Sequence, residues 1–180
     1  MMVETDEIEQ QIERIRTGEM EERRDASRRL GAGGEAAVGP LIEALASTAD
    51  NDARWYYAVS LARIGHPAVV PLIAALREQR DPAFRRYAAA TLAEFGPEAV
   101  DPLVEMLAVE GDDELRGFAA LALNRLGEPA IEALTRAVEG GGTLGAVAGL
   151  VLWRMDEAGI KALVGVCAPC EEAAVPGPEV

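Results

Sequence analysis

The chain has 180 residues, of which 49% are hydrophobic, 27% charged and only 4% aromatic, the composition of a folded chain rich in small aliphatic side chains. No apolar run reaches the roughly 18 residues that span a bilayer, and the first ten residues lack the basic start of a secretory signal. A net charge of −14 disfavours binding to phosphate backbones, because nucleic-acid readers carry basic stripes. We therefore expect a cytoplasmic protein that binds neither membranes nor nucleic acids.

The first predicted element is an acidic amphipathic helix over residues 4–16. Ile8, Ile12 and Ile15 recur at helical spacing and form one apolar stripe on it. Stacked repeats need a terminal element that covers their apolar end and has a polar outer face. We therefore expect residues 1–22 to form an N-terminal capping helix for the segment that follows.

Residues 23–167 repeat with a period of 31 residues. Three residue types keep this spacing through four repeats: Arg23, Arg54, Arg85 and Arg116; Leu30, Leu61, Leu92 and Leu123; Gly34, Gly65, Gly96 and Gly127. Self-similarity at this period is typical of stacked units, none of which buries its apolar face alone. Each unit reads as two helices. The period therefore predicts an all-α solenoid of about five two-helix repeats.

Each repeat carries its own start and stop signals. Asp50, Asp81 and Asp112 are N-cap residue types that precede an alanine-rich first helix. In the second repeat this helix is predicted over residues 53–64, and Gly65 is expected to form a left-handed C-cap. In three repeats the second helix has a proline in its first turn, where the missing N–H costs nothing: Pro40, Pro71 and Pro102.

The fifth unit, residues 143–167, is two residues short. It has Asp156 in place of the repeated glycine and Gly145 in place of the repeated arginine, as expected of an atypical terminal repeat. The residues that follow, 168–180, contain three prolines and are predicted to be a disordered tail.

Residues 54–76 carry the pattern that suggests a family. The pattern is Arg54-x-x-x-Ala58-x-x-Leu61-x-x-Ile64-Gly65-x-Pro67-Ala68-Val69-x-Pro71-Leu72-Ile73-x-Ala75-Leu76. It resembles HEAT repeats, and most closely the short HEAT-like repeats of phycobilisome (bilin) lyases, over about residues 23–167. The resemblance implies a right-handed α-solenoid whose first helices line a concave face. It says little about function, because the same repeat serves scaffolds, adaptors, chromophore lyase subunits and a metal hydroxylase.

One series of charged residues is interpreted as structural. In three repeats an aspartate and an arginine are four residues apart and share one helix face: Asp50 and Arg54, Asp81 and Arg85, Asp112 and Arg116. Stacking the repeats interleaves these side chains into a ladder. We therefore expect the loss of one arginine to destabilise the stack rather than to abolish an activity.

The sequence predicts no metal and no cofactor. His66 is the single histidine, and the two-iron HEAT-like hydroxylases need several His–Glu pairs. Cys167 and Cys170 have CxxC spacing, but a structural zinc site needs a second pair of ligands. Cys167 aligns with apolar residues that close the second helix of earlier repeats. A redox switch or a metal shared across a dimer stays open as an alternative for the two cysteines.

A strip on the first helices is the predicted binding site. On a helical wheel Trp55, Tyr56, Val59 and Arg63 fall within one arc, nearly opposite the core positions of the same helix. The equivalent positions of the other repeats complete this strip, which we call the first-helix arc: Arg24 and Arg28; Arg86, Tyr87 and Ala90; Phe118 and Leu121; Val147 and Leu150. Tyr56, Tyr87 and Phe118 are spaced by 31 and predict an aromatic row.

An apolar strip on a charged surface indicates a partner site. We expect a non-catalytic scaffold that holds an apolar helix or an extended peptide, with the acidic rim disfavouring acidic partners. Self-association as a homodimer and plain packing within the stack are the alternatives for the strip. The alternative function is a subunit of a chromophore lyase, or an adaptor that presents a substrate to an enzyme. No nucleophile–base pair or phosphate loop is present in the sequence, so an enzyme is not expected.

Overall fold

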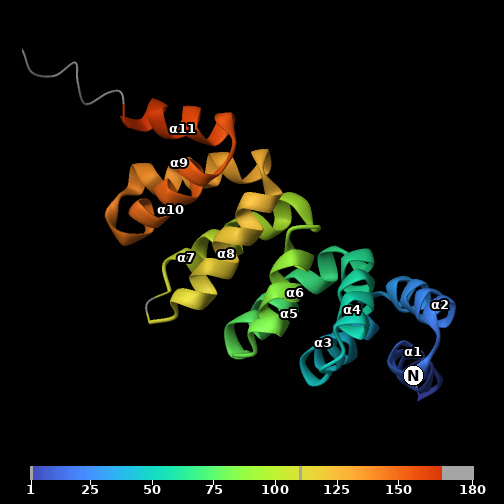
Figure 1. Cartoon of the computed structure of the whole chain (residues 1–180). Coiled ribbons are helices and arrows are strands. Elements are labelled where there is room, and N and C mark those ends of the chain that lie inside the picture. The colour runs from blue at the N-terminus through green and yellow to red at the C-terminus, as the bar shows by residue number, and fades with distance from the viewer. Residues whose placement is uncertain (1, 110, 168–180) are drawn as a thin grey trace, which may run out of the picture.

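The computed structural model describes residues 2–109 and 111–167, and over these residues the chain is helical throughout, with no strand. The helices form one continuous stacked array, with α1 (Met2–Thr17) at one end and α11 (Glu157–Cys167) at the other (Figure 1). Neighbouring repeats contact each other along the array. The predicted α-solenoid of helical repeats is therefore confirmed.

Each 31-residue unit is one pair of helices. The first helices of the five repeats are α2 (Met20–Ala32), α4 (Asn51–Ile64), α6 (Pro82–Leu92), α8 (Asp113–Leu126) and α10 (Gly142–Arg154). The second helices are α3 (Val38–Ser47), α5 (Val69–Glu78), α7 (Val100–Leu107), α9 (Glu128–Gly140) and α11. Three short 3-10 turns lead into second helices: η1 (Gly34–Ala37), η2 (His66–Ala68) and η3 (Gly96–Ala99). The repeated prolines lie in the first turn of α3, α5 and α7, as predicted.

The repeated aspartates are N-caps. An Asp50 carboxylate oxygen accepts a hydrogen bond from the Asp52 N–H at 2.9 Å, and Asp112 accepts one from the Leu115 N–H at 2.9 Å. Asp81 caps α6 in the same way through two backbone N–H groups. Each aspartate satisfies donors that the first turn of a helix leaves unpaired, so the predicted starts of these helices are confirmed.

The glycine that ends the first helix differs from the expected left-handed cap. Gly65 has a φ of 76°, but its ψ is −138°, and Gly127 has nearly the same conformation. The Gly65 N–H still donates to the Leu61 carbonyl at 3.2 Å. In this region of backbone space only glycine is readily accommodated. The glycine therefore turns the chain sharply toward the second helix instead of closing the helix with an αL residue.

At the N-terminal end α1 covers the first repeat. Ile15 is fully buried, Ile8 and Ile12 are half-buried, and the Tyr57 hydroxyl on α4 donates to the Ile12 carbonyl at 3.2 Å. The repeat begins at α2, whose N-cap is Glu19, so the first repeat starts a few residues before the predicted boundary at residue 23. The predicted tail, residues 168–180, lies outside the described residues.

The core follows the 31-residue register. Leu61, Leu92 and Leu123 of the first helices are fully buried, and so are Leu72 and Leu103 of the second helices. Neighbouring repeats share these side chains, because no single helix pair encloses its own apolar stripe. The apolar content of the chain is thus concentrated between the helices.

No single helix of the described residues is both long and apolar enough to cross a membrane, and α4 and α5 meet that test only together, across a bend of 119°.

Candidate functional site: an apolar groove between α8 and α10

A ladder of ion pairs joins the starts of the first helices. Arg23, Arg54 and Arg85 each reach the aspartate of the next repeat, and the pairs do not form between an arginine and the aspartate four residues earlier on its own helix. The pairs are Arg23–Asp50 at 3.0 Å, Arg54–Asp81 at 2.7 Å and Arg85–Asp112 at 2.8 Å, measured between guanidinium nitrogen and carboxylate oxygen. These pairs fix the spacing of α2, α4, α6 and α8 at one edge of the array.

Arg85 is the most deeply placed member of the ladder. Its side chain is fully buried, and its Nε donates to the Gln79 carbonyl at 2.6 Å. Its two terminal nitrogens contact Asp112, and one of them also contacts Glu114 at 3.2 Å. The hydrogen bond from Arg85, with one from the Leu115 N–H, lowers the pKa of Asp112 to about 2. This carboxylate therefore stays charged and holds the buried guanidinium in place.

The ladder ends at Arg116. The shortened fifth repeat has Gly141 where an aspartate would face this arginine, and Arg116 instead contacts Asp113 on its own helix. Gly145 stands in place of the next ladder arginine, and a Cβ atom added there would lie 3.0 Å from the Ala137 carbonyl oxygen. The bare backbone of Gly145 lets α10 pack directly against α9. No ion pair of the described residues then ties the start of α10 to α8.

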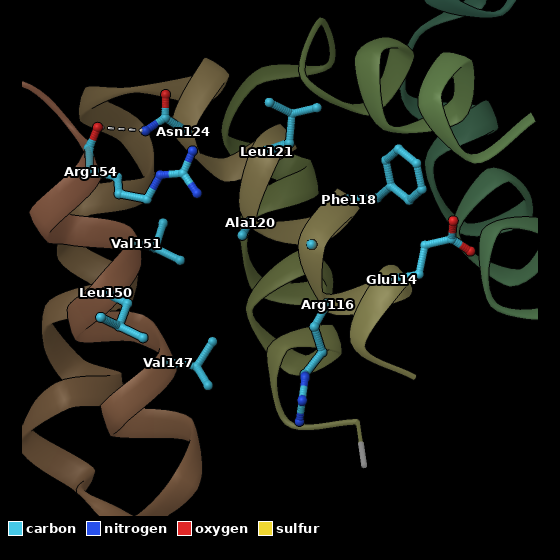
Figure 2. A pocket seen from close by; sticks show the side chains of 11 residues that line it. Glu114, Arg116, Phe118, Ala120, Leu121, Asn124, Val147, Leu150, Val151 and Arg154 are labelled. Carbon is cyan, nitrogen blue, oxygen red and sulfur yellow. Dashed lines mark hydrogen bonds between the residues drawn. The ribbon is translucent and has the colours of Figure 1, made fainter. Parts of the chain in front are cut away.

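A groove opens where the ladder stops. It lies between α8 and α10 and has a volume of ≈ 630 Å³. Val147, Leu150 and Val151 point from α10 toward α8, while Arg154 and Asn124 meet at one end (Figure 2). Its remaining lining residues come from α8: Glu114, Arg116, Gly117, Phe118, Ala120 and Leu121. Leu121 is 47% exposed and Leu150 is 66% exposed, so the walls of the groove are apolar and uncovered in this chain.

One register position differs in size between the closed and the open contact. Between α2 and α4 this position is Gly31, whose Cα faces the Arg63 side chain so closely that an added Cβ would lie 2.7 Å from the Arg63 Cβ. The equivalent residue on α8 is Asn124, whose Nδ2 donates to the Arg154 carbonyl at 3.1 Å. A glycine lets two helices touch, whereas the asparagine side chain occupies the space between them. The helices α8 and α10 are therefore held apart.

The groove unites only part of the predicted first-helix arc. Phe118, Leu121, Val147 and Leu150 line it together. The other members lie on earlier helices and outside the groove: Arg24 and Arg28 on α2; Trp55, Tyr56, Val59 and Arg63 on α4; Arg86, Tyr87 and Ala90 on α6. All of these are exposed or half-buried, and their role in binding stays a prediction.

The aromatic row is partly structural, which differs from the expectation that the arc is free of the stack. Tyr56, Tyr87 and Phe118 are half-buried against the core. The Tyr87 hydroxyl donates to the Asn51 carbonyl at 3.1 Å and so links α6 to α4, while the Arg86 guanidinium lies 5.5 Å from the Tyr87 ring centre. A tyrosine is long enough to span the gap to the preceding helix. Helical angle alone does not reveal that reach.

Sequence reasoning did not select Asn124, Ala120 or Val151 as part of the site, whereas it placed Arg154 at the register of Arg63 in the last repeat. The signal for Asn124 was present, because the earlier repeats have Gly31, Ala62 and Ala93 at its register. A change from a small residue to a larger polar one at a helix–helix contact indicates a wider spacing. Arg116 was assigned to the ladder, whereas it also borders the groove.

The candidate metal and redox residues do not come together. His66 is exposed, and its Nδ1 lies 2.7 Å from a Glu98 carboxylate oxygen in the next repeat. Within residues 2–109 and 111–167 no cluster of three or more histidine, cysteine or acidic side chains is arranged to hold a metal. Cys170 and the side chain of Cys167 fall outside what the structure describes, so the two alternatives for them stay open.

Comparison with known proteins agrees with the repeat register. The family model of HEAT repeats matches residues 69–142, from the start of α5 to the start of α10. No curated protein matches the chain. The match does not distinguish one kind of HEAT-like repeat from another, so the closeness to bilin lyases stays a prediction. The chain is therefore an α-solenoid whose middle segment is similar to HEAT repeats, a repeat type common in protein-interaction scaffolds.

Proposed function

We propose that this protein is a non-catalytic protein-binding module and that its partner places apolar side chains in the groove between α8 and α10. The observation that carries the proposal is the convergence of aliphatic side chains from two adjacent helices on an open trough. Leu121 and Leu150 are the most exposed of them. Burying a fully exposed leucine contributes about 1.5–3 kcal/mol, and because Leu121 and Leu150 are 47% and 66% exposed, a partner that covers both gains roughly half of that value from each.

The shape of the groove favours a protein segment. It runs along α8 from Arg116 to Asn124, eight residues, which corresponds to about 12 Å at the helical rise. That length accommodates roughly two turns of a helix or four residues of an extended chain. Sites for small molecules bury most of the ligand surface, whereas this trough is open along one side. A chain that passes along the trough therefore fits better than an enclosed ligand.

The test is a double variant with Leu121→Ser and Leu150→Ser, with Val70→Ser as the matched control. Val70 on α5 is 71% exposed and does not line the groove. Each variant, carrying a photo-crosslinker on α10, is used to capture partners from the native host, and crosslinked peptides are mapped by mass spectrometry. We expect the double variant to have the same melting temperature as the wild type. The yield of partner crosslinked to α8 and α10 is expected to fall at least tenfold. The control is expected to retain that capture.

Two results would contradict the proposal. Undiminished capture by the double variant would place the partner elsewhere on the array. The second result is measured by sedimentation velocity. A wild type that is a dimer, together with a double variant that is a monomer, would assign the groove to self-association rather than to another protein.

A further inference from the structure

We infer that the groove binds an acidic, apolar protein segment, whose carboxylates meet arginines of the first-helix arc while its apolar side chains fill the trough. The inference rests on the proposed function and adds the charge of the partner to it. It reverses the expectation that the acidic rim disfavours acidic partners. Its basis is the way in which the few basic residues of this acidic chain are paired.

The chain has 31 acidic and 17 basic residues, so carboxylates are available to pair with nearly every basic group. Most arginines outside the arc are in fact paired, as the ladder shows. Within the described residues, seven basic side chains have no ion pair and no hydrogen bond, and five of them lie on the arc or at its equivalent position in the last repeat: Arg24, Arg28, Arg63, Arg86 and Arg154, the other two being Arg14 and Lys161. Unpaired guanidinium groups are thus concentrated on one face.

Carboxylates are almost excluded from the same face. At the register of the arc and of Arg63, only Asp25 and Glu94 are acidic. Asp25 accepts from Arg29 at 2.9 Å, and Glu94 is 3.4 Å from Arg125. Most of the acidic surplus therefore lies elsewhere, and the one carboxylate that lines the groove, Glu114, is paired with Arg85. The first-helix arc forms a cationic strip on a protein whose net charge is −14.

Arg154 joins this strip to the groove. It is exposed in the last turn of α10, and its side chain reaches the end of the trough where Asn124 holds the backbone (Figure 2). At the opposite end Arg116 is already engaged by Asp113. A segment bound in the trough therefore meets an unpaired guanidinium group, that of Arg154, at one end only. This asymmetry predicts that the critical carboxylate of the partner lies at the Arg154 end.

A protein segment suits this face better than a nucleic acid. Single-stranded nucleic acids bind by stacking bases on open aromatic faces, along a positively charged channel. Here the Tyr87 ring lies under Arg86, and Tyr56 and Phe118 are half-buried against the core. Apart from Phe118, the apolar side chains that line the trough are aliphatic, and they match leucine or valine better than bases. The field of the whole chain also repels a polyanion more than it repels a few carboxylates.

The test uses two fluorescent alanine-based peptides of about 16 residues, long enough to be helical. Both carry a stripe of leucines, flanked two turns apart by glutamates in one peptide and by lysines in the other. Binding to the wild-type chain, to Arg154→Gln and to Lys161→Gln is measured by fluorescence anisotropy, at low and at high salt. Lys161 is the control because it is exposed and unpaired but lies on α11, away from the groove.

We expect the glutamate peptide to bind at least tenfold more tightly than the lysine peptide at low salt. The Arg154→Gln change is expected to reduce its affinity about threefold to fivefold, and Lys161→Gln to leave it unchanged. In nitrogen–proton correlation spectra, the changes in backbone amide chemical shift on adding the glutamate peptide should be largest in α8 and α10. High salt should narrow the difference between the peptides, because exposed charges are screened.

The possible failures separate the two proposals. Equal binding of both peptides, abolished by the Leu121 and Leu150 double change, would overturn the acidic preference and leave the apolar groove intact. Binding of neither peptide, together with capture that ignores the leucine changes, would overturn both. An oligothymidylate, or dodecanoate as a lone apolar carboxylate, that binds more tightly than the glutamate peptide would assign the face to nucleic acid or to a fatty acid instead.

Discussion

The helix pairs α2–α4 and α8–α10 are equivalent neighbours in the array, yet the first pair is closed and the second is open. In the closed pair Gly31 meets the Arg63 side chain, and the Ser60 hydroxyl donates to the Ser27 hydroxyl oxygen at 3.0 Å. In the open pair Asn124 and Val151 take the places of small residues, and the groove lies between the helices. A repeat protein can thus keep one fold throughout and still differ between repeats, with small side chains at a closed contact and larger ones beside a groove.

The ion-pair ladder shows the same contrast. Arg85 bridges to the next repeat and is fully buried, whereas Arg116 contacts only Asp113 on its own helix. Gly141 and Gly145 explain the difference, because neither offers a charged side chain at the start of α10. The ladder therefore ends at the shortened repeat, next to the groove between α8 and α10.

The largest expected effect compares Arg85→Ala with Arg116→Ala. Removing the buried Arg85 takes the main partner from the Gln79 carbonyl and leaves Asp112 with Arg80 alone as an ion-pair partner, which costs about 1–3 kcal/mol of unfolding free energy. Removing the partly exposed Arg116 is expected to cost less than about 1 kcal/mol. Urea denaturation of both variants measures the difference. Equal losses would mean that the ladder does not distinguish the two ends of the array.

The next effect is smaller: Gly31→Ala and Gly117→Ala are expected to change the stability of the chain in opposite directions. The added methyl at Gly31 collides with the Arg63 side chain, and we expect a net loss of about 1–2 kcal/mol. At Gly117, on the open side of α8, nothing lies within 4 Å of the added Cβ. Replacing a helical glycine there is expected to stabilise the chain by about 0.5–1 kcal/mol. Thermal melts in which both variants shift in the same direction would contradict the contrast between closed and open contacts.

The smallest effect is a dependence of stability on acid. The pKa of Asp112 is lowered from its ordinary 3.8 to about 2, so the folded state prefers the charged carboxylate. Its stabilising effect is complete above the ordinary pKa and is lost as the pH falls toward 2. Between about pH 4 and pH 2 the wild type should therefore lose more stability than Asp112→Asn, which has no carboxyl group to protonate. The stability of both proteins is measured from urea denaturation midpoints over this pH range. Equal losses of stability would show that Asp112 does not contribute to the pH dependence.

The sequence by itself determined the fold, because each local signal recurs at the same register. The leucines of the 31-residue period predicted the shared core, the aspartates predicted the N-caps, and the prolines predicted the start of the second helices. The N-terminal helix was predicted to cap the stack, and Ile15 is fully buried against it. These features depend on short-range spacing and on apolar periodicity, both of which can be read along the chain.

The tertiary structure alone decided which part of the first-helix arc forms a groove. A helical wheel gives the direction of Tyr87 and Leu121 equally well, but only packing shows that Tyr87 bonds to Asn51 while Leu121 faces open space. A ladder was expected from the sequence, but the partner of each arginine, the aspartate of the next repeat, is decided by the packing of the helices. The distance between two stacked helices depends on side chains contributed by both, about 30 residues apart in the chain, so no pattern within one helix determines it.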